Sequence, residues 1–179
     1  MESINSSWQF SETWSEDFLN WKDEDVKEVR IPHTVKMLPL HYADDRSYQM
    51  ISGYRRKLMI PEEAKGKRVF LRFDGTAHIA TLYVNRKEVC THQAGYTAFR
   101  CEISDLIKAG KECEIAVRLD STENGSIPPF GYVIDYLTYG GIYRPVWLEI
   151  EEEEYISDIF VQTRDLHTAK VAVTIDGDP

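Results

Sequence analysis

The chain has 179 residues, and 21 Lys and Arg against 30 Asp and Glu give it a formal net charge of −9 at pH 7. This length allows one complete domain and part of a second, and it is sufficient to bury a hydrophobic core. The acidic balance repels phosphate groups, which excludes nucleic acids and anionic membranes as favoured partners. Aromatic residues make up 12% of the chain, and this content argues against disorder.

Three cysteines, Cys90, Cys101 and Cys113, stand close together in the sequence without a Cys-x-x-Cys pair. Their apolar or alternating surroundings predict reduced, buried thiols. The first residues show neither the basic nor the apolar region of a signal peptide, and no run of about 18 apolar residues predicts a membrane span. We therefore expect a cytoplasmic protein, with a periplasmic or secreted location as the alternative if an export signal has been removed.

Apolar and polar residues alternate through most of the chain, which is typical of strands with one face on a core. The expected strands are residues 8–10, 26–31, 54–60, 69–73, 76–84, 87–92, 99–103, 113–119, 146–150, 155–163 and 169–176. One helical turn is predicted at residues 104–108, with Ser104 as its N-cap and Gly110 as its end. Many short strands without long helices predict an all-β, antiparallel sandwich or jelly roll.

The C-terminal part of the chain predicts the beginning of a second domain. Residues 151–154 are four consecutive glutamates, which we interpret as a solvated connection. The two strands that follow cannot close a sandwich on their own. We therefore expect a fragment of a longer polypeptide, with one domain over residues 1–153 and the start of a second over residues 154–179.

Familiar cofactor and metal signatures are absent from the sequence. It contains no Gly-x-Gly-x-x-Gly, no phosphate-binding loop and no His-Glu-x-x-His, so we expect neither a cofactor nor a metal. Cys90 and His92 would share one strand face, but two ligands are too few for zinc. His33, which follows Pro32, is expected to be a hydrogen-bonding strand terminus.

The segment richest in chemistry belongs to the long irregular stretch 121–141. There Asp135 stands near Tyr136 and Tyr139. Carboxylate oxygens accept hydrogen bonds from sugar hydroxyls, and tyrosine rings can cover the apolar faces of a pyranose. The alternative, which composition alone favours, is structural: Asp135 caps a turn and the tyrosines fill the end of the sandwich.

Residues 139–148, Tyr-Gly-Gly-Ile-Tyr-Arg-Pro-Val-Trp-Leu, resemble the Gly-Gly-Ile-Tyr-Arg signature of the N-terminal sugar-binding domain of glycoside hydrolase family two, the β-galactosidase and β-glucuronidase group. Gly140 and Gly141 structure the loop in this interpretation, and Arg144 fixes it through an ion pair or a carbonyl. Further motifs resemble the family in the same order, at residues 3–10, 31–34, 54–56, 69–75, 82–85 and 92–99. An ordered series of motifs is more specific than any one of them.

The resemblance implies a jelly-roll β-sandwich of the galactose-binding-like type, followed by the first strands of an immunoglobulin-like sandwich. It also implies that the catalytic acid/base and nucleophile are two glutamates on a (β/α)₈ barrel further along the polypeptide. This sequence has no Asn-Glu dipeptide and no carboxylate pair that we would place about 5–5.5 Å apart, as retaining hydrolysis requires. No catalytic residue is therefore assigned.

One substrate contact is carried over from the family. Asp135 lies nine positions before Arg144, which matches the family's aspartate that enters the active site and binds substrate hydroxyls. Galactosidases add an asparagine from an earlier loop, but residues 41–48 contain none. Asp44 and Asp45 are the loose candidates there, so the choice between galactosides and glucuronides stays open.

A second departure from the family pattern lies in a hairpin. Asn85-Arg86 replaces the common Asn-Gly pair, so the turn lacks the glycine that favours type I′ geometry.

The function expected from the sequence is that of a non-catalytic, sugar-binding N-terminal part of a retaining exo-β-glycosidase, inactive by itself. Its expected partners are a β-galactoside or β-glucuronide and the catalytic barrel of the same polypeptide, and the parent's oligomeric state is left open. Two alternatives are a self-sufficient carbohydrate-binding module and a purely structural β-sandwich for subunit contacts.

Overall fold

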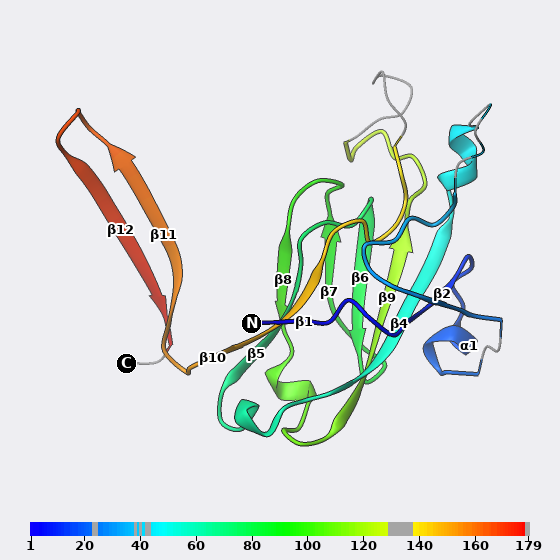
Figure 1. The fold of residues 1–179 in the computed structure, drawn as a ribbon, viewed down its shortest axis with the longest axis horizontal. Coiled ribbons are helices and arrows are strands. Elements are labelled where there is room, and N and C mark those ends of the chain that lie inside the picture. The colour runs from blue at the N-terminus through cyan, green and yellow to red at the C-terminus, as the bar shows by residue number, and fades with distance from the viewer. Residues whose placement is uncertain (23–24, 38, 40, 42–43, 129–137, 178–179) are drawn as a thin grey trace.

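A computed structural model describes residues 1–22, 25–37, 39, 41, 44–128 and 138–177. Most of these residues form two sheets packed face to face, and a C-terminal hairpin projects away from them (Figure 1). Every pairing between strands of the described residues is antiparallel. The predicted all-β class and jelly-roll sandwich are confirmed.

The two sheets contain nearly all the strands expected from the sequence. The larger sheet has, in spatial order, β3 (Lys27–Val29), β2 (Trp8–Ser11), β4 (Ile51–Met59), β9 (Glu112–Asp120), β6 (Ile79–Val84) and β7 (Lys87–Gln93). The smaller sheet has β1 (Glu2–Ser3), β10 (Val146–Glu151), β5 (Arg68–Phe73) and β8 (Phe99–Glu102). Only the two-residue strand β1 was not expected, because so short a segment carries no visible alternation.

The core lies between the two sheets, and the alternating pattern of the sequence identifies the faces that line it. The side chains of β9 and β5 that belong to the core are Cys113, Ile115, Val117, Leu119, Val69, Leu71 and Phe73. Because successive side chains of a strand point to opposite faces, every second residue enters the core. The remaining positions of these strands face outward.

One short helix, α1 (Glu16–Leu19), covers the outer face of the larger sheet. The Phe18 amide donates to the Ser15 hydroxyl over 3.0 Å, so Ser15 caps the helix. The buried Phe18 ring lies directly over Gly53, where a Cβ would come within 2.6 Å of it. A single helical turn has no periodicity to detect, and the sequence prediction therefore missed it.

Three 3-10 turns complete the helical structure of the described residues. They are η1 (Asp45–Tyr48), η2 (Glu62–Ala64) and η3 (Ser104–Leu106). The predicted helical turn exists as η3, but the prediction that Ser104 caps it is wrong. The Ser104 hydroxyl instead accepts from the Val69 amide over 2.9 Å and donates to Glu102 over 2.9 Å. Gly110 ends the segment with a φ of 69°, which favours glycine.

The prediction of three reduced cysteines is wrong for two of them. Cys90 on β7 and Cys101 on β8 form a disulfide that joins the two sheets at one edge of the sandwich. Their separation of 11 residues carries no pairing signal, because the register of the two sheets decides which side chains meet. Cys113 is free and buried, as predicted, and burial raises the pKa of its thiol to about 11.

The hairpin between β6 and β7 has type I′ geometry, although it lacks the glycine that favours this turn. Asn85 and Arg86 have φ angles of 49° and 69°, the left-handed conformation that a type I′ turn requires at both positions. The Asn85 amide group donates to the Leu106 carbonyl over 2.6 Å and accepts from the Glu114 amide over 3.0 Å. Its side chain thus anchors the turn to neighbouring elements.

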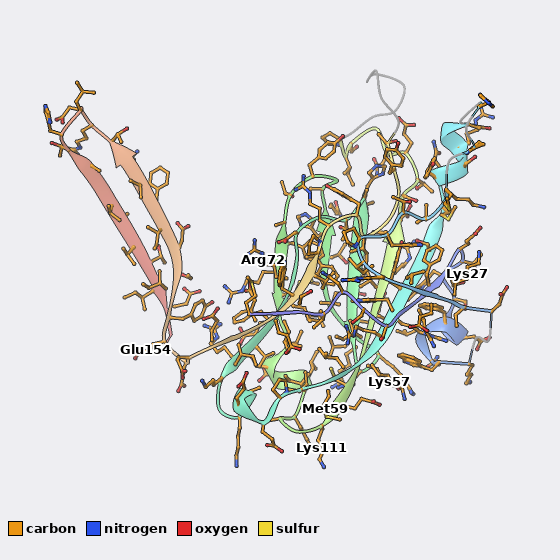
Figure 2. All side chains as sticks on the ribbon, in the orientation of Figure 1. Lys27, Lys57, Met59, Arg72, Lys111 and Glu154 are labelled. Atoms are coloured by element: carbon orange, nitrogen blue, oxygen red, sulfur yellow. A yellow bond between two sulfur atoms is a disulfide. The ribbon has the colours of Figure 1, made fainter. Side chains whose placement is uncertain are left out.

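The C-terminal hairpin consists of β11 (Tyr155–Thr163) and β12 (Ala169–Asp176). Figure 2 places Glu154 at the bend between the sandwich and this hairpin. The Tyr155 ring packs against Phe70 with centroids 5.8 Å apart, but several apolar side chains beyond it are more than half exposed, namely Ile156, Ile159, Phe160, Val161 and Ile175. The division at residues 153 and 154, with an immunoglobulin-like second domain, stays a prediction. No helix of the described residues is long and apolar enough to cross a membrane.

The disulfide gives the first testable prediction. The chain, purified without reductant and then denatured, is expected to react with one equivalent of a thiol reagent at Cys113, and with three equivalents after reduction. Replacing Cys90 and Cys101 together by serine is expected to lower the free energy of unfolding by about 3 kcal/mol, because the unfolded chain gains conformational entropy when the disulfide no longer closes a short loop. Denaturant titration measures this loss, and three reactive thiols before reduction would contradict the cross-link.

Candidate functional site

The candidate site is built on residues 139–142, which we call the rim segment. It lies at the end of the sandwich where β9 ends and β4 begins (Figure 1), whereas Met59 and Lys111 mark the opposite end in Figure 2. Asp135 and Tyr136 lie outside the described residues, so the structure does not test their predicted contact with substrate. The rim segment and Arg144 are described.

Backbone hydrogen bonds hold the rim segment from two sides. On one side, the Val35 amide donates to the Gly140 carbonyl over 3.0 Å, and the His33 amide donates to the Ile142 carbonyl over 2.8 Å. On the other side, Ala77 and Gly141 exchange amide-to-carbonyl bonds of 3.0 and 3.3 Å. The rim segment therefore lies between two stretches of chain that are distant in sequence. His33 forms hydrogen bonds, as expected, but the prediction that it ends a strand is wrong, because β3 ends at Val29.

The two glycines permit this close approach. Gly141 has a φ of 134°, and a Cβ there would collide with the His33 carbonyl oxygen and lie 3.0 Å from the Thr34 Cα. A Cβ on Gly140 would lie 2.7 Å from the Ser121 side chain. Side chains at these positions would push the neighbouring backbone away. The geometry supports the predicted loop-structuring role of both residues.

Beneath the rim segment lies a buried tyrosine that contacts a half-buried histidine. The His33 Nδ1 atom is 2.8 Å from the Tyr54 hydroxyl oxygen. Burial raises the pKa of Tyr54 well above its usual range, and a backbone hydrogen bond from Ile142 opposes this rise. Burial, assisted by the charge of Lys27, lowers the pKa of His33. Both side chains are therefore neutral near pH 7.

Tyr139 presents an aromatic ring at the rim. Its side chain is 45% exposed, and the ring meets the buried Tyr48 edge to face with centroids 5.4 Å apart. Ser121 fixes the backbone under this pair by donating to the Tyr48 carbonyl over 2.5 Å and accepting from the Met50 amide over 3.3 Å. A ring supported at its edge and open to solvent is suited to contact with a sugar face.

Three buried polar atoms close to the rim segment have no hydrogen-bond partner among the described residues. They are Tyr48 Oη, Thr76 Oγ1 and His78 Nε2. Tyr48 contacts Tyr139, while Thr76 and His78 flank the Ala77 that pairs with Gly141. Since buried polar atoms are normally hydrogen-bonded, this part of the rim retains hydrogen-bonding capacity. No sequence pattern indicated it, because Tyr48 is distant in sequence from Thr76 and His78.

The other predicted residues near the rim have more ordinary surroundings. Tyr143 donates to the Gly95 carbonyl over 2.6 Å, which ties the signature to the loop after β7. The exposed Arg144 guanidinium lies 5.3 Å from the Tyr143 ring centroid. Its predicted ion pair or carbonyl partner does not occur within the described part of the chain, so that role stays a prediction. Asp44 caps η1 by accepting from the Arg46 amide over 3.0 Å.

The chain is similar to known proteins. The family model described as "Glycosyl hydrolases family 2, sugar binding domain" matches residues 1–151, a range that contains the whole rim segment. The chain belongs to glycosyl hydrolase family 2. The resemblance seen in the sequence motifs is thereby confirmed.

Family members similar to this chain include both galactosidases and glucuronidases. A β-galactosidase from Thermoanaerobacter pseudethanolicus is 35% identical over 175 residues, which cover 97% of this chain and 22% of that protein. A β-glucuronidase from Bacteroides fragilis is 38% identical over 156 residues, covering 87% of this chain and 21% of that protein. A calcium-binding mutant of β-glucuronidase 2 from Bacteroides uniformis superimposes with a TM-score of 0.85 at 26% identity, covering 99% and 22% of the two chains. The chain thus spans about a fifth of the length of these family 2 relatives.

The tight packing at Gly141 gives a second prediction. Gly141→Ala is expected to lower the free energy of unfolding by about 3 kcal/mol or more, because strain at a positive φ adds to a collision with backbone. The matched control is Gly66→Ala, since Gly66 also has a positive φ of 73° but no atom within 4 Å of its Cβ position. This control is expected to cost about 1 kcal/mol. Equal losses in a denaturant titration would show that the close approach is unimportant.

The buried histidines give a third prediction. Burial lowers the pKa of His33, His78 and His92 from 6.5. The unfolded chain therefore binds more protons than the folded chain as the pH falls below about 6.5, so stability is full above that pH and declines below it. The denaturant concentration at the midpoint of unfolding is expected to fall as the pH is lowered from about 7.5 to about 5.5. A midpoint that is constant or rises over this interval would refute the assignment.

Proposed function

We propose that this chain is the non-catalytic N-terminal part of a retaining exo-β-glycosidase that acts on β-galactosides or β-glucuronides. The family assignment supports this proposal, as do relatives named β-galactosidase and β-glucuronidase that are several times longer than the chain. The observation that carries it is the rim segment, which is held on both sides by backbone hydrogen bonds. A rigid base of this kind suits a loop that must reach into a sugar site formed elsewhere.

In this proposal the loop next to the rim segment contributes to substrate binding. Asp135 accepts hydrogen bonds from sugar hydroxyls, and Tyr136 and Tyr139 contact the sugar or its surroundings. The exposed and supported ring of Tyr139 is consistent with this role. The catalytic barrel, which supplies the chemistry, is the partner of this surface within the same polypeptide.

The C-terminal hairpin extends the proposal to the organisation of the parent. Residues 154–179 would open an immunoglobulin-like domain, and the exposed apolar side chains of β11 and β12 are suited to packing inside it. The disulfide between Cys90 and Cys101 favours the periplasmic or secreted location over the cytoplasm, because disulfides persist mainly in oxidising compartments.

A fourth prediction tests the function. The isolated chain is expected to show no turnover of nitrophenyl β-galactoside or β-glucuronide and little binding of either sugar, because one loop buries too little of a ligand. In the longer enzyme, Asp135→Ala is expected to lower kcat/KM by about tenfold to a hundredfold, the effect of losing a charged hydrogen bond. Asp105→Ala, which removes an exposed carboxylate on η3, is the matched control and is expected to have no effect.

The other outcomes separate the alternatives. Saturable binding of a sugar by the isolated chain, abolished by Asp135→Ala, would support a self-sufficient carbohydrate-binding module. A longer enzyme that is indifferent to Asp135→Ala would support a structural sandwich that only makes subunit contacts. Turnover by the isolated chain, free of contaminating enzyme, would contradict the non-catalytic assignment.

A further inference from the structure

We propose that His33 and Tyr54 are positioning residues, which hold the rim segment in its sugar-binding conformation through hydrogen bonds that join the Tyr54 hydroxyl, His33 and the Ile142 carbonyl. The proposal rests on the proposed function, because it assigns to these residues a role in sugar binding by way of the rim. Neither residue touches the sugar in this scheme.

The geometry joins both residues to the same short stretch of backbone. The Tyr54 hydroxyl oxygen lies 2.8 Å from His33 Nδ1. The His33 amide donates a hydrogen bond of 2.8 Å to the Ile142 carbonyl. His33 therefore joins the Tyr54 side chain to the Ile142 carbonyl in one circuit of hydrogen bonds.

The direction of each hydrogen bond follows from the number of available protons. Within the described part of the chain, His33 Nδ1 is the side-chain hydrogen-bond partner of the Tyr54 hydroxyl, so the Tyr54 proton points to His33. His33 Nδ1 must then accept, which requires a neutral imidazole with its proton on Nε2. Tyr54 is fully buried, so it has no water to replace a lost partner.

The surroundings of His33 favour this neutral form. The Phe10 ring of β2 lies 4.8 Å from the imidazole, centroid to centroid, and Tyr54 of β4 lies below. Lys27 of β3 is the charged group whose field reaches the imidazole. It is 3.5 Å from Glu12, which also pairs with Lys36 over 2.8 Å. Protonating His33 would add a positive charge near Lys27 and leave the Tyr54 hydroxyl without an acceptor.

Hydrogen exchange of the full chain tests the circuit without any assay of activity. Tyr54→Phe keeps the ring but removes the hydroxyl that holds the His33 imidazole, so the amide of His33, which donates to the Ile142 carbonyl, is expected to exchange about tenfold faster. The matched control is Tyr83→Phe, which removes the same atom from a ring that stacks on Trp14 and faces away from the core. Unchanged exchange in Tyr54→Phe, or an equal increase in both variants, would overturn the proposal.

The second experiment measures kcat/KM in the longer enzyme and separates positioning from bulk stability. His33→Asn places an amide oxygen near the position of Nδ1, so it can accept from Tyr54 but cannot be protonated in this pH range. It is expected to keep kcat/KM near pH 7 and to lose any decline in kcat/KM that His33 protonation causes at lower pH. His33→Ala and Tyr54→Phe are both expected to lower kcat/KM about tenfold or more.

The outcomes distinguish this proposal from the function on which it rests. If Asp135→Ala impairs the enzyme but His33→Ala does not, or if His33→Asn is as impaired as His33→Ala, the positioning role is wrong and the proposed function stands. If Asp135→Ala has no effect, the proposed function is wrong, whatever the two positioning variants do. Should Tyr54→Phe fail to fold, the contrast between the Asn and Ala variants of the half-buried His33 still decides the question.

Discussion

The close approach of three backbone stretches at Gly141 is the constraint on which the rest of the site depends. Residues 33–35 bind the rim segment on one side, and Ala77 binds it on the other. No side chain can be inserted at Gly141 without displacing the His33 carbonyl. This contact between backbone atoms therefore sets the positions of the exposed Tyr139 ring and of the start of β10.

Side chains extend this constraint into the sandwich. Through its contact with His33, Tyr54 connects the rim segment to the middle of β4. Tyr143 connects it to the loop after β7 by donating to the Gly95 carbonyl. The disulfide between Cys90 and Cys101 closes the same edge of the sandwich, where the two strands belong to different sheets. The site is thus supported by both sheets.

Much of the fold could be predicted from the sequence, because the relevant signals are local. Alternation along β5, β9 and β10 identified strands and core faces, and the Gly-Gly-Ile-Tyr-Arg motif identified the rim segment and the family. What escaped prediction depends on contacts distant in sequence. The Ser121 hydroxyl meets the Tyr48 carbonyl across 73 positions, and neither residue has a local pattern that announces it. The disulfide was missed for the same reason. Helix α1 was missed because a single turn shows no periodicity in the sequence.

The C-terminal hairpin has a practical consequence for anyone who handles this polypeptide. Its apolar side chains, including Phe160 and Ile175, are more than half exposed. Each of its two strands has one edge without a partner strand among the described residues, and such edges can recruit further strands. We therefore expect the hairpin to promote association between molecules in concentrated solution. Ending the polypeptide at Glu151, the last residue of β10, would remove these exposed side chains while retaining every strand of the two-layer sandwich, so we expect the shorter version to associate less.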